Sequence, residues 1–313
     1  MPAARRLTLV VCALAATLSG RRADAYVRTL SDNGVPSSWR GTNCLPVVVY
    51  PKGFSEMTAD EVTTATMAAA AAWSSGENGC TYINLDVMTS SDDGPVAVPQ
   101  AHAAIIFREG EWCHVEADGG CSADAKENER YDPSALMVTS VVIGVKSGEI
   151  IRGSTEVNVK DWGWADLVTH PERASAHTQD FQNALTHELG HFIGLDHTCA
   201  EAGTDPWPLD DMGARVPDCN ASPPDVQATT MFASAPPGDT EKRTLAPDDQ
   251  RGVCGIYPVA ADPGRCVAPT GMLMATKAGC SCATAETSRA GVLAPVFVTV
   301  LMLGRRRRRR HFC

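Results

Sequence analysis

The stretch T-H-E-L-G-H-F-I-G-L-D-H-T, residues 186–198, contains three of the chain's eight histidines. His187 and His191 are four residues apart, so a helix would present both imidazoles on one face. Two neutral imidazoles at this spacing can hold one zinc ion. A left-handed turn at Gly194 would end the helix and bring His197 back as a third ligand. Three histidine ligands leave one position open for water, which is typical of catalytic rather than structural zinc.

Glu188 follows the first of these histidines directly. It cannot share the same ligand geometry, but it can reach a water at the open position, which favours a role as general base. With this composition, H-E-x-x-H alone arises by chance in roughly one chain in a hundred, and the added Gly and His lower this to roughly two in a hundred thousand. Four other histidines are predicted to be ordinary surface or hydrogen-bonded residues: His102, His114, His170 and His177.

Residues 1–25 have the three parts of a secretory signal peptide. Arg5 and Arg6 precede a short apolar core over 7–18, and the small-x-small site Ala23-Asp24-Ala25 follows. The sequence therefore predicts export and cleavage before Tyr26. The apolar core is too short for a membrane span, for which about twenty residues are needed. The alternative is a buried N-terminal helix.

The C-terminal segment 280–313 also carries transport signals. An apolar stretch over 290–304 is followed by six arginines, and Cys280 and Cys282 lie just upstream. Together these parts resemble the myxobacterial C-terminal sorting tail (MYXO-CTERM). That resemblance implies a location at the cell surface or outside the cell, and a membrane protease as a partner that processes the tail during export. A plain transmembrane tail anchor and a nucleic-acid-binding arginine run are the alternatives.

The body between these ends is strongly acidic. Residues 26–279 hold 16 Lys and Arg against 35 Asp and Glu, a formal charge of −19. This balance argues against a nucleic-acid partner. It suits an exported protein and leaves room for calcium sites without identifying any.

Eight of the twelve cysteines lie in the body, and an even number behind a signal peptide predicts disulfides. Eight cysteines allow about 105 pairings. We expect the sequential set, because its last three links close short loops. Zinc ligation by thiols is the alternative, but the body has no Cys-x-x-Cys spacing. The expected pairs are Cys44–Cys80, Cys113–Cys121, Cys199–Cys219 and Cys254–Cys266.

Hydrophobic periodicity predicts one α/β domain over residues 26–260, followed by a linker over 261–279. A capping box at 58–61, T-A-D-E, should start the first helix. A second helix is expected over 178–194, and a third should begin at 246–250, A-P-D-D-Q. The expected strands are 45–50, 80–88, 103–107, 135–145 and 149–159, the last two as a hairpin.

The zinc motif H-E-L-G-H-F-I-G-L-D-H resembles the extended signature of the metzincins. Met231, in T-T-M-F, is the candidate for their Met-turn, and Met212 is a weaker one because no helix signal follows it. The segment 244–257 looks like the last helix of matrixins, and 131–142 and 148–158 resemble strands of small bacterial matrixin-like proteases. The resemblance covers roughly residues 44–258.

This resemblance implies a metzincin-like catalytic domain, with a twisted mixed sheet, an active-site helix and a C-terminal helix. It implies a monomeric zinc endopeptidase with one Zn²⁺ and Glu188 as the base. Met231 would form an apolar floor under the metal. A protein or peptide substrate would pair with the sheet edge, and the segment after Met231 would wall a side-chain pocket. A zinc amidase acting on cell-wall material and an inactive surface zinc protein are the rival interpretations. The interval from His197 to Met231 is longer than in typical matrixins, and Cys199 and Cys219 should staple it.

Overall fold

The computed structural model describes residues 26–50, 54, 57–89, 103–113, 130–266 and 297–303. The strands are β1 (Val27–Arg28), β2 (Cys44–Val49), β3 (Asn84–Thr89), β4 (Ala103–Arg108), β5 (Ala135–Ile143), β6 (Ile150–Asn158), β7 (Gly163–Ala165), β8 (Thr178–Asp180), β9 (Leu195–Asp196) and β10 (Phe297–Leu303). The helices are α1 (Ala59–Trp73), α2 (Phe181–Phe192), α3 (Pro224–Gln227) and α4 (Pro247–Ile256). Short 3₁₀ turns include η4 (Glu241–Arg243).

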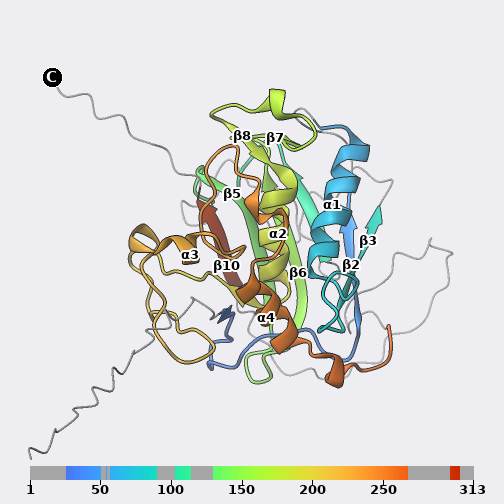
Figure 1. The fold of residues 1–313 in the computed structure, drawn as a ribbon, viewed down its shortest axis with the longest axis vertical. Coiled ribbons are helices and arrows are strands. Elements are labelled where there is room, and N and C mark those ends of the chain that lie inside the picture. Colours follow the sequence, from blue (N-terminus) through green and yellow to red (C-terminus); the bar gives the residue numbers. More distant parts are fainter. Residues whose placement is uncertain are drawn as a thin grey trace, which may run out of the picture.

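The main sheet has the strand order β10-β5-β6-β4-β2-β3. Strands β3, β2, β4 and β6 run parallel, whereas β5 and β10 are antiparallel to their neighbours. Helices α1 and α2 lie side by side over this sheet (Figure 1). The predicted α/β class with a mixed sheet, a motif-bearing helix and a late helix is therefore confirmed. The hairpin expected over 135–159 is present as β5 and β6.

A single large core lies between the helices and the sheet. The fully buried Trp73, at the end of α1, donates from its indole N–H to the carbonyl of Thr186 in α2 at 2.7 Å. At the last residue of α2, the carbonyl of Phe192 accepts from the indole N–H of Trp39 at 2.8 Å. Burying a large apolar side chain contributes about 1.5–3 kcal/mol. Both indoles thus hold α2 in place by packing and by hydrogen bonding.

Helix α1 begins as the sequence predicts. The Thr58 hydroxyl accepts from the amide of Glu61 at 3.2 Å, and the Glu61 carboxylate accepts from the amide of Thr58 at 2.7 Å. This reciprocal pair is a capping box.

Two elements begin later than predicted. The expected strand over 80–88 is β3, which begins at Asn84, because Cys80 is linked to Cys254 in α4 and Thr81 donates to the carbonyl of Tyr257 directly after α4. The expected helix over 178–194 begins at Phe181, because residues 178–180 pair with β7 as a strand. Helix propensity at that point is overridden by strand pairing.

Two of the predicted disulfides are wrong. Cys44 pairs with Cys266 and Cys80 with Cys254, so neither Cys44–Cys80 nor Cys254–Cys266 exists. The link Cys199–Cys219 is present. Cys113 also forms a disulfide, while its expected partner Cys121 lies outside the described residues.

The link from Cys44 to Cys266 affects the expected domain boundary. The sequence assigns residues 261–266 to a linker, but this disulfide joins the end of that stretch to β2. Arg265 also accepts from the amide of Asn43 through its main-chain carbonyl at 3.0 Å. This stretch is therefore attached to the body of the protein.

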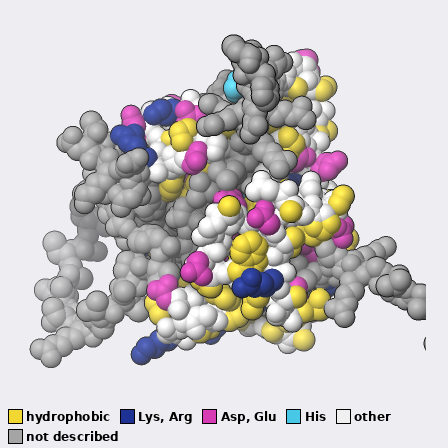
Figure 2. Space-filling view, turned by 90° about the vertical axis from the view of Figure 1, so that its left-hand side faces the viewer, with side chains coloured by type: hydrophobic (Ala, Val, Ile, Leu, Met, Phe, Trp, Pro, Cys, Tyr) yellow, Lys and Arg dark blue, Asp and Glu magenta, His cyan; other side chains and the backbone are white. Residues whose placement is uncertain are grey.

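The predicted transport segments lie largely outside the described residues. Within the apolar stretch of the tail, β10 pairs antiparallel with β5, with Val298 opposite Val141. The described part of the chain has no helix that is long and apolar enough to cross a membrane. On the face shown in Figure 2, the described carboxylates are scattered among apolar side chains, and basic side chains are few.

Candidate metal centre

Helix α2 is fixed at both ends. At its start, the Asp180 carboxylate accepts from the amide of Asn183 at 2.8 Å and caps the helix. At its end, Gly194 has φ +99°, the left-handed conformation predicted for it. A Cβ at this position would lie 2.6 Å from the carbonyl oxygen of Ser37. The chain can therefore turn back tightly after α2 only with glycine at this position.

That turn brings the three histidines of the motif together. The Nε2 atoms of His187 and His191 are 3.0 Å apart, and those of His187 and His197 are 3.2 Å apart. His187 and His191 come from α2, and His197 comes from the segment directly after β9. The three residues can offer one nitrogen each within 4.8 Å of one another. The predicted cluster thus exists in space.

The outer hydrogen bonds of two of these rings define their tautomer. His187 Nδ1 lies 2.7 Å from the carbonyl oxygen of Thr230, and His191 Nδ1 lies 2.9 Å from that of Leu195. A carbonyl can only accept, so both Nδ1 atoms carry the proton. The Nε2 atom of each neutral ring is then bare, and the two lone pairs face each other. A cation between the rings would stabilise such an arrangement, and this is how histidine ligands of metals are commonly oriented.

Protonation does not resolve this repulsion. Burial lowers the pKa of His191 to about 3 and holds the pKa of His187 well below its ordinary value. Both imidazoles are therefore neutral at physiological pH, the form that ligates a metal. The donor set fits zinc, which takes imidazole nitrogens readily.

Glu188 lies in the same helix and is completely buried. Neither of its carboxylate oxygens has a hydrogen bond of normal geometry within the described part of the chain, although Thr139 lies close enough to oppose the rise in the pKa of this carboxyl. Burial raises the pKa of this carboxyl to about 8. A buried carboxylate without such hydrogen bonds is costly unless a water, a substrate or a cation completes it. The Thr139 hydroxyl in β5 approaches the main-chain carbonyl of Glu188 at 3.3 Å, so β5 runs alongside this position.

Met231 lies directly under the helix that carries the histidines. Its sulfur occupies the space that a Cβ on Gly190 would need, and the Trp73 ring closes the same space from the other side. Met231 is 1 % exposed, whereas the rival candidate Met212 is 69 % exposed. Of these two methionines, only Met231 is buried against the helix that carries the histidines, and its role as an apolar floor stays a prediction.

The turn around Met231 is held by a residue whose role the sequence did not reveal. Asp249 in α4 accepts from the amides of Thr230 at 2.7 Å and Met231 at 3.2 Å. The sequence indicated only a helix-dipole contribution for Asp249. Its carboxylate instead connects α4 to the turn whose Thr230 carbonyl orients His187. An acidic residue at the third position of a helix carries no local signal of this longer contact.

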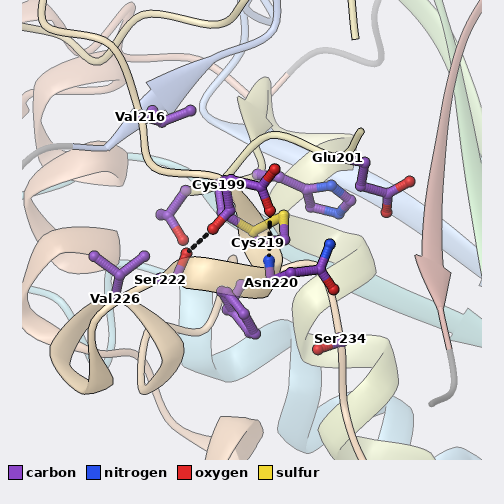
Figure 3. Close-up of a disulfide and its surroundings, with 12 residues drawn as sticks. Cys199, Glu201, Val216, Cys219, Asn220, Ser222, Val226 and Ser234 are labelled. Carbon is purple, nitrogen blue, oxygen red and sulfur yellow. Dashed lines mark hydrogen bonds between the residues drawn. A yellow bond between two sulfur atoms is a disulfide. The ribbon is translucent and has the colours of Figure 1, made fainter. Parts of the chain in front are cut away.

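The long interval between His197 and Met231 contains a disulfide. Figure 3 shows the Cys199–Cys219 disulfide in this loop, with Ser222 and Asn220 beside it. Both of these residues hydrogen-bond to Asp218, through the Ser222 hydroxyl and the Asn220 amide. The disulfide thus closes the loop as expected.

A cavity of about 610 Å³ lies against this loop. Its lining runs from Cys219 and Pro224 to the segment after Met231, where it includes Phe232, Ser234 and Asp239. The segment after Met231 therefore lines a cavity, and its use as a substrate pocket stays a prediction.

The two other histidines among the described residues do not join the cluster. His170 lies beside Glu61 and Glu172 on the surface, and His177 is exposed. His102 and His114 are outside the described residues. A second group of potential ligands contains Cys44 and Cys266, but their disulfide makes the thiols unavailable.

No family model and no curated protein sequence matches this chain. Among solved structures, the chain is similar to high choriolytic enzyme 1, a hatching enzyme zinc-protease from Oryzias latipes (medaka fish). The match has a TM-score of 0.29 and 12 % identity, and covers 69 % of this chain and 92 % of the other.

Proposed function

We propose that this chain is an exported zinc endopeptidase with Glu188 as its general base. One observation carries the proposal: three imidazole nitrogens converge, with separations of 3.0 and 3.2 Å, and the helix that supplies two of them also carries the fully buried carboxyl group of Glu188. A site that only stores zinc has no need of such a carboxylate. A hydrolytic site needs a proton acceptor in this place.

A zinc ion held by His187, His191 and His197 would polarise the scissile carbonyl and acidify a nearby water. Glu188 would accept the proton of the attacking water on a carboxylate oxygen and then pass it to the leaving amine. The carbonyls of Thr230 and Leu195 keep the rings of His187 and His191 oriented through their Nδ1 protons. Met231 excludes water from below the helix.

The sheet edge suggests an extended peptide as the substrate. Strand β5 runs beside Glu188, and its outer edge accepts β10 in an antiparallel pairing from Phe297 opposite Val142 onward. This edge can therefore bind an extended segment by main-chain hydrogen bonds, which is one common way of recognising peptides. The cavity that begins at Phe232 would receive one substrate side chain.

Export is supported by the disulfides. Three are formed within the described residues, and such bonds persist in oxidising compartments rather than in the cytosol. We propose that residues 1–25 direct secretion and that the tail is an export device.

The decisive assay uses the purified exported protein, stripped of metal and then given zinc. It should cleave casein or gelatin only when zinc is present, and it should leave peptidoglycan intact. Peptidoglycan cleavage without casein cleavage would identify a cell-wall amidase instead. Zinc binding with neither activity would identify an inactive surface zinc protein.

Deleting residues 280–313 should release a folded and active enzyme into the medium. The large core is built by residues between Trp39 and Tyr257, so the fold should survive loss of the tail. Removing β10 also frees the β5 edge, so turnover of long unstructured substrates should rise. Activity in medium and cell fractions, with thermal melting, tests this. Retention of the truncated protein on the cell surface would show that the tail does not attach it there. A large fall in melting temperature would show that the fold needs β10.

A further inference from the structure

Lys242 is a buried lysine that the proposed chemistry leaves without a role. It lies in η4, at the end of the segment that follows Met231, and is 3 % exposed. No salt bridge to it is formed among the described residues. Burial lowers its pKa to about 8, since its charge is only partly compensated by Asp239 and Asp249 at longer range. Burying an ammonium group is costly, so its hydrogen bonds must be important.

These hydrogen bonds go to the wall of the cavity. The Lys242 ammonium donates to the carbonyl of Phe232 at 2.6 Å and to that of Ser234 at 2.9 Å. It also lies 5.6 Å from the centre of the Phe232 ring, within range of a cation–π contact. Phe232 and Ser234 both line the cavity.

The main chain of the same residue is fixed to the helix that carries the histidines. The amide of Lys242 donates to the side-chain oxygen of Asn183 in α2 at 2.6 Å. The neighbouring Arg243 donates from Nε to the Asp180 carboxylate, the cap of that helix, at 2.8 Å. Lys242 therefore links α2 on one side to the cavity wall on the other.

We propose that Lys242 is a positioning residue that holds the wall formed by Phe232 and Ser234 at a fixed distance from α2, and so determines which substrate side chain the cavity accepts. This inference rests on the proposed peptidase function. Two hydrogen bonds from a fixed ammonium hold this wall in one position, so the cavity keeps one width. Without the ammonium, the carbonyls must turn to water and the wall loosens.

The test compares the zinc-loaded full-length exported protein with Lys242→Met, Lys242→Arg and the exposed control Lys146→Met. Peptides that differ only in the side chain entering the cavity are ranked by kcat/KM. Pockets of this kind discriminate by about 10–200-fold, and we expect Lys242→Met to reduce that ratio about tenfold. A peptide with glycine at that position should be cleaved within about twofold of the wild-type rate. Lys242→Arg, which keeps a charged donor, should retain most of the discrimination.

Hydrogen exchange gives a readout that does not need activity. The amides of Phe232 and Asp239, which donate to the carbonyls of Thr229 and Pro236, should exchange about tenfold faster in Lys242→Met than in wild type. Unchanged discrimination and exchange, in an enzyme that cleaves peptides, would overturn the role of Lys242 and leave the function intact. Loss of peptide cleavage in the wild type would overturn the function, and the exchange rates would still decide whether Lys242 holds the wall. If Lys242→Met does not fold, Lys242→Gln replaces it in both measurements, and Lys242→Arg is again compared with wild type. Discrimination ratios and exchange rates in Lys242→Gln equal to those in Lys146→Met would overturn the proposal.

Discussion

Replacing Glu188 by glutamine should remove nearly all hydrolysis while zinc and the fold remain. The amide has the size of the carboxylate but cannot accept the proton of the attacking water. General-base catalysis contributes about 10²–10⁴-fold, so kcat should fall by about a thousandfold, or about 4 kcal/mol of barrier. The change should not unfold the protein, since the two carboxylate oxygens have no hydrogen bonds of normal geometry within the described residues to lose.

The experiment measures kcat, bound zinc and melting temperature on the same preparation. Glu77→Gln, at an exposed position after α1, is the matched control and should change none of them. Substantial turnover by the Glu188 variant with zinc fully loaded would show that another group is the base. A parallel loss of zinc would show instead that Glu188 helps to hold the metal.

The central part of the candidate site could be predicted from sequence because its geometry is local. Two imidazoles four residues apart share a helix face, and Gly194 adopts the left-handed turn that returns the chain. The capping box at Thr58 is local in the same way. Periodicity also predicted most strands of the main sheet, because strands buried on both faces give continuous runs of β-branched residues.

The parts that could not be predicted depend on long-range contacts. The pairs Cys44–Cys266 and Cys80–Cys254 span 222 and 174 residues. Proximity along the chain favoured shorter loops, but the fold brings Cys266 next to the start of β2 and Cys80 next to α4 instead. Pairing of β8 with β7 displaced the predicted helix start for the same reason.

The supporting residues of the site were missed because their types are ambiguous. Asp249 looks like a helix-dipole residue, and Lys242 lies in a polar run before a helix. Neither position has periodicity that indicates burial. Only the folded chain shows that one carboxylate holds the turn at Met231 and that one ammonium holds the wall at Phe232.

His197→Ala should weaken zinc binding and hydrolysis together. His197 differs from its two partners because it comes from the segment after the glycine turn rather than from α2, so it tests the extended part of the motif. Its Nε2 lies 3.2 Å from that of His187, and the alanine variant leaves only two nitrogens at the site. Loss of a group that merely orients a ligand costs about 10–100-fold in metal affinity. Loss of the ligand itself should exceed about a hundredfold.

Zinc affinity is measured by competition with a chelator of known strength, and kcat/KM is measured at saturating zinc. His177→Ala removes an exposed histidine from the same region of sequence and should alter neither quantity. Partial recovery of hydrolysis at high zinc would agree with a weakened site, since mass action refills it. Full zinc occupancy and near-normal hydrolysis at low zinc would contradict ligation by His197. In that case the glycine turn would serve the fold alone, and the metal would be held by the helix pair His187 and His191 with some other third group.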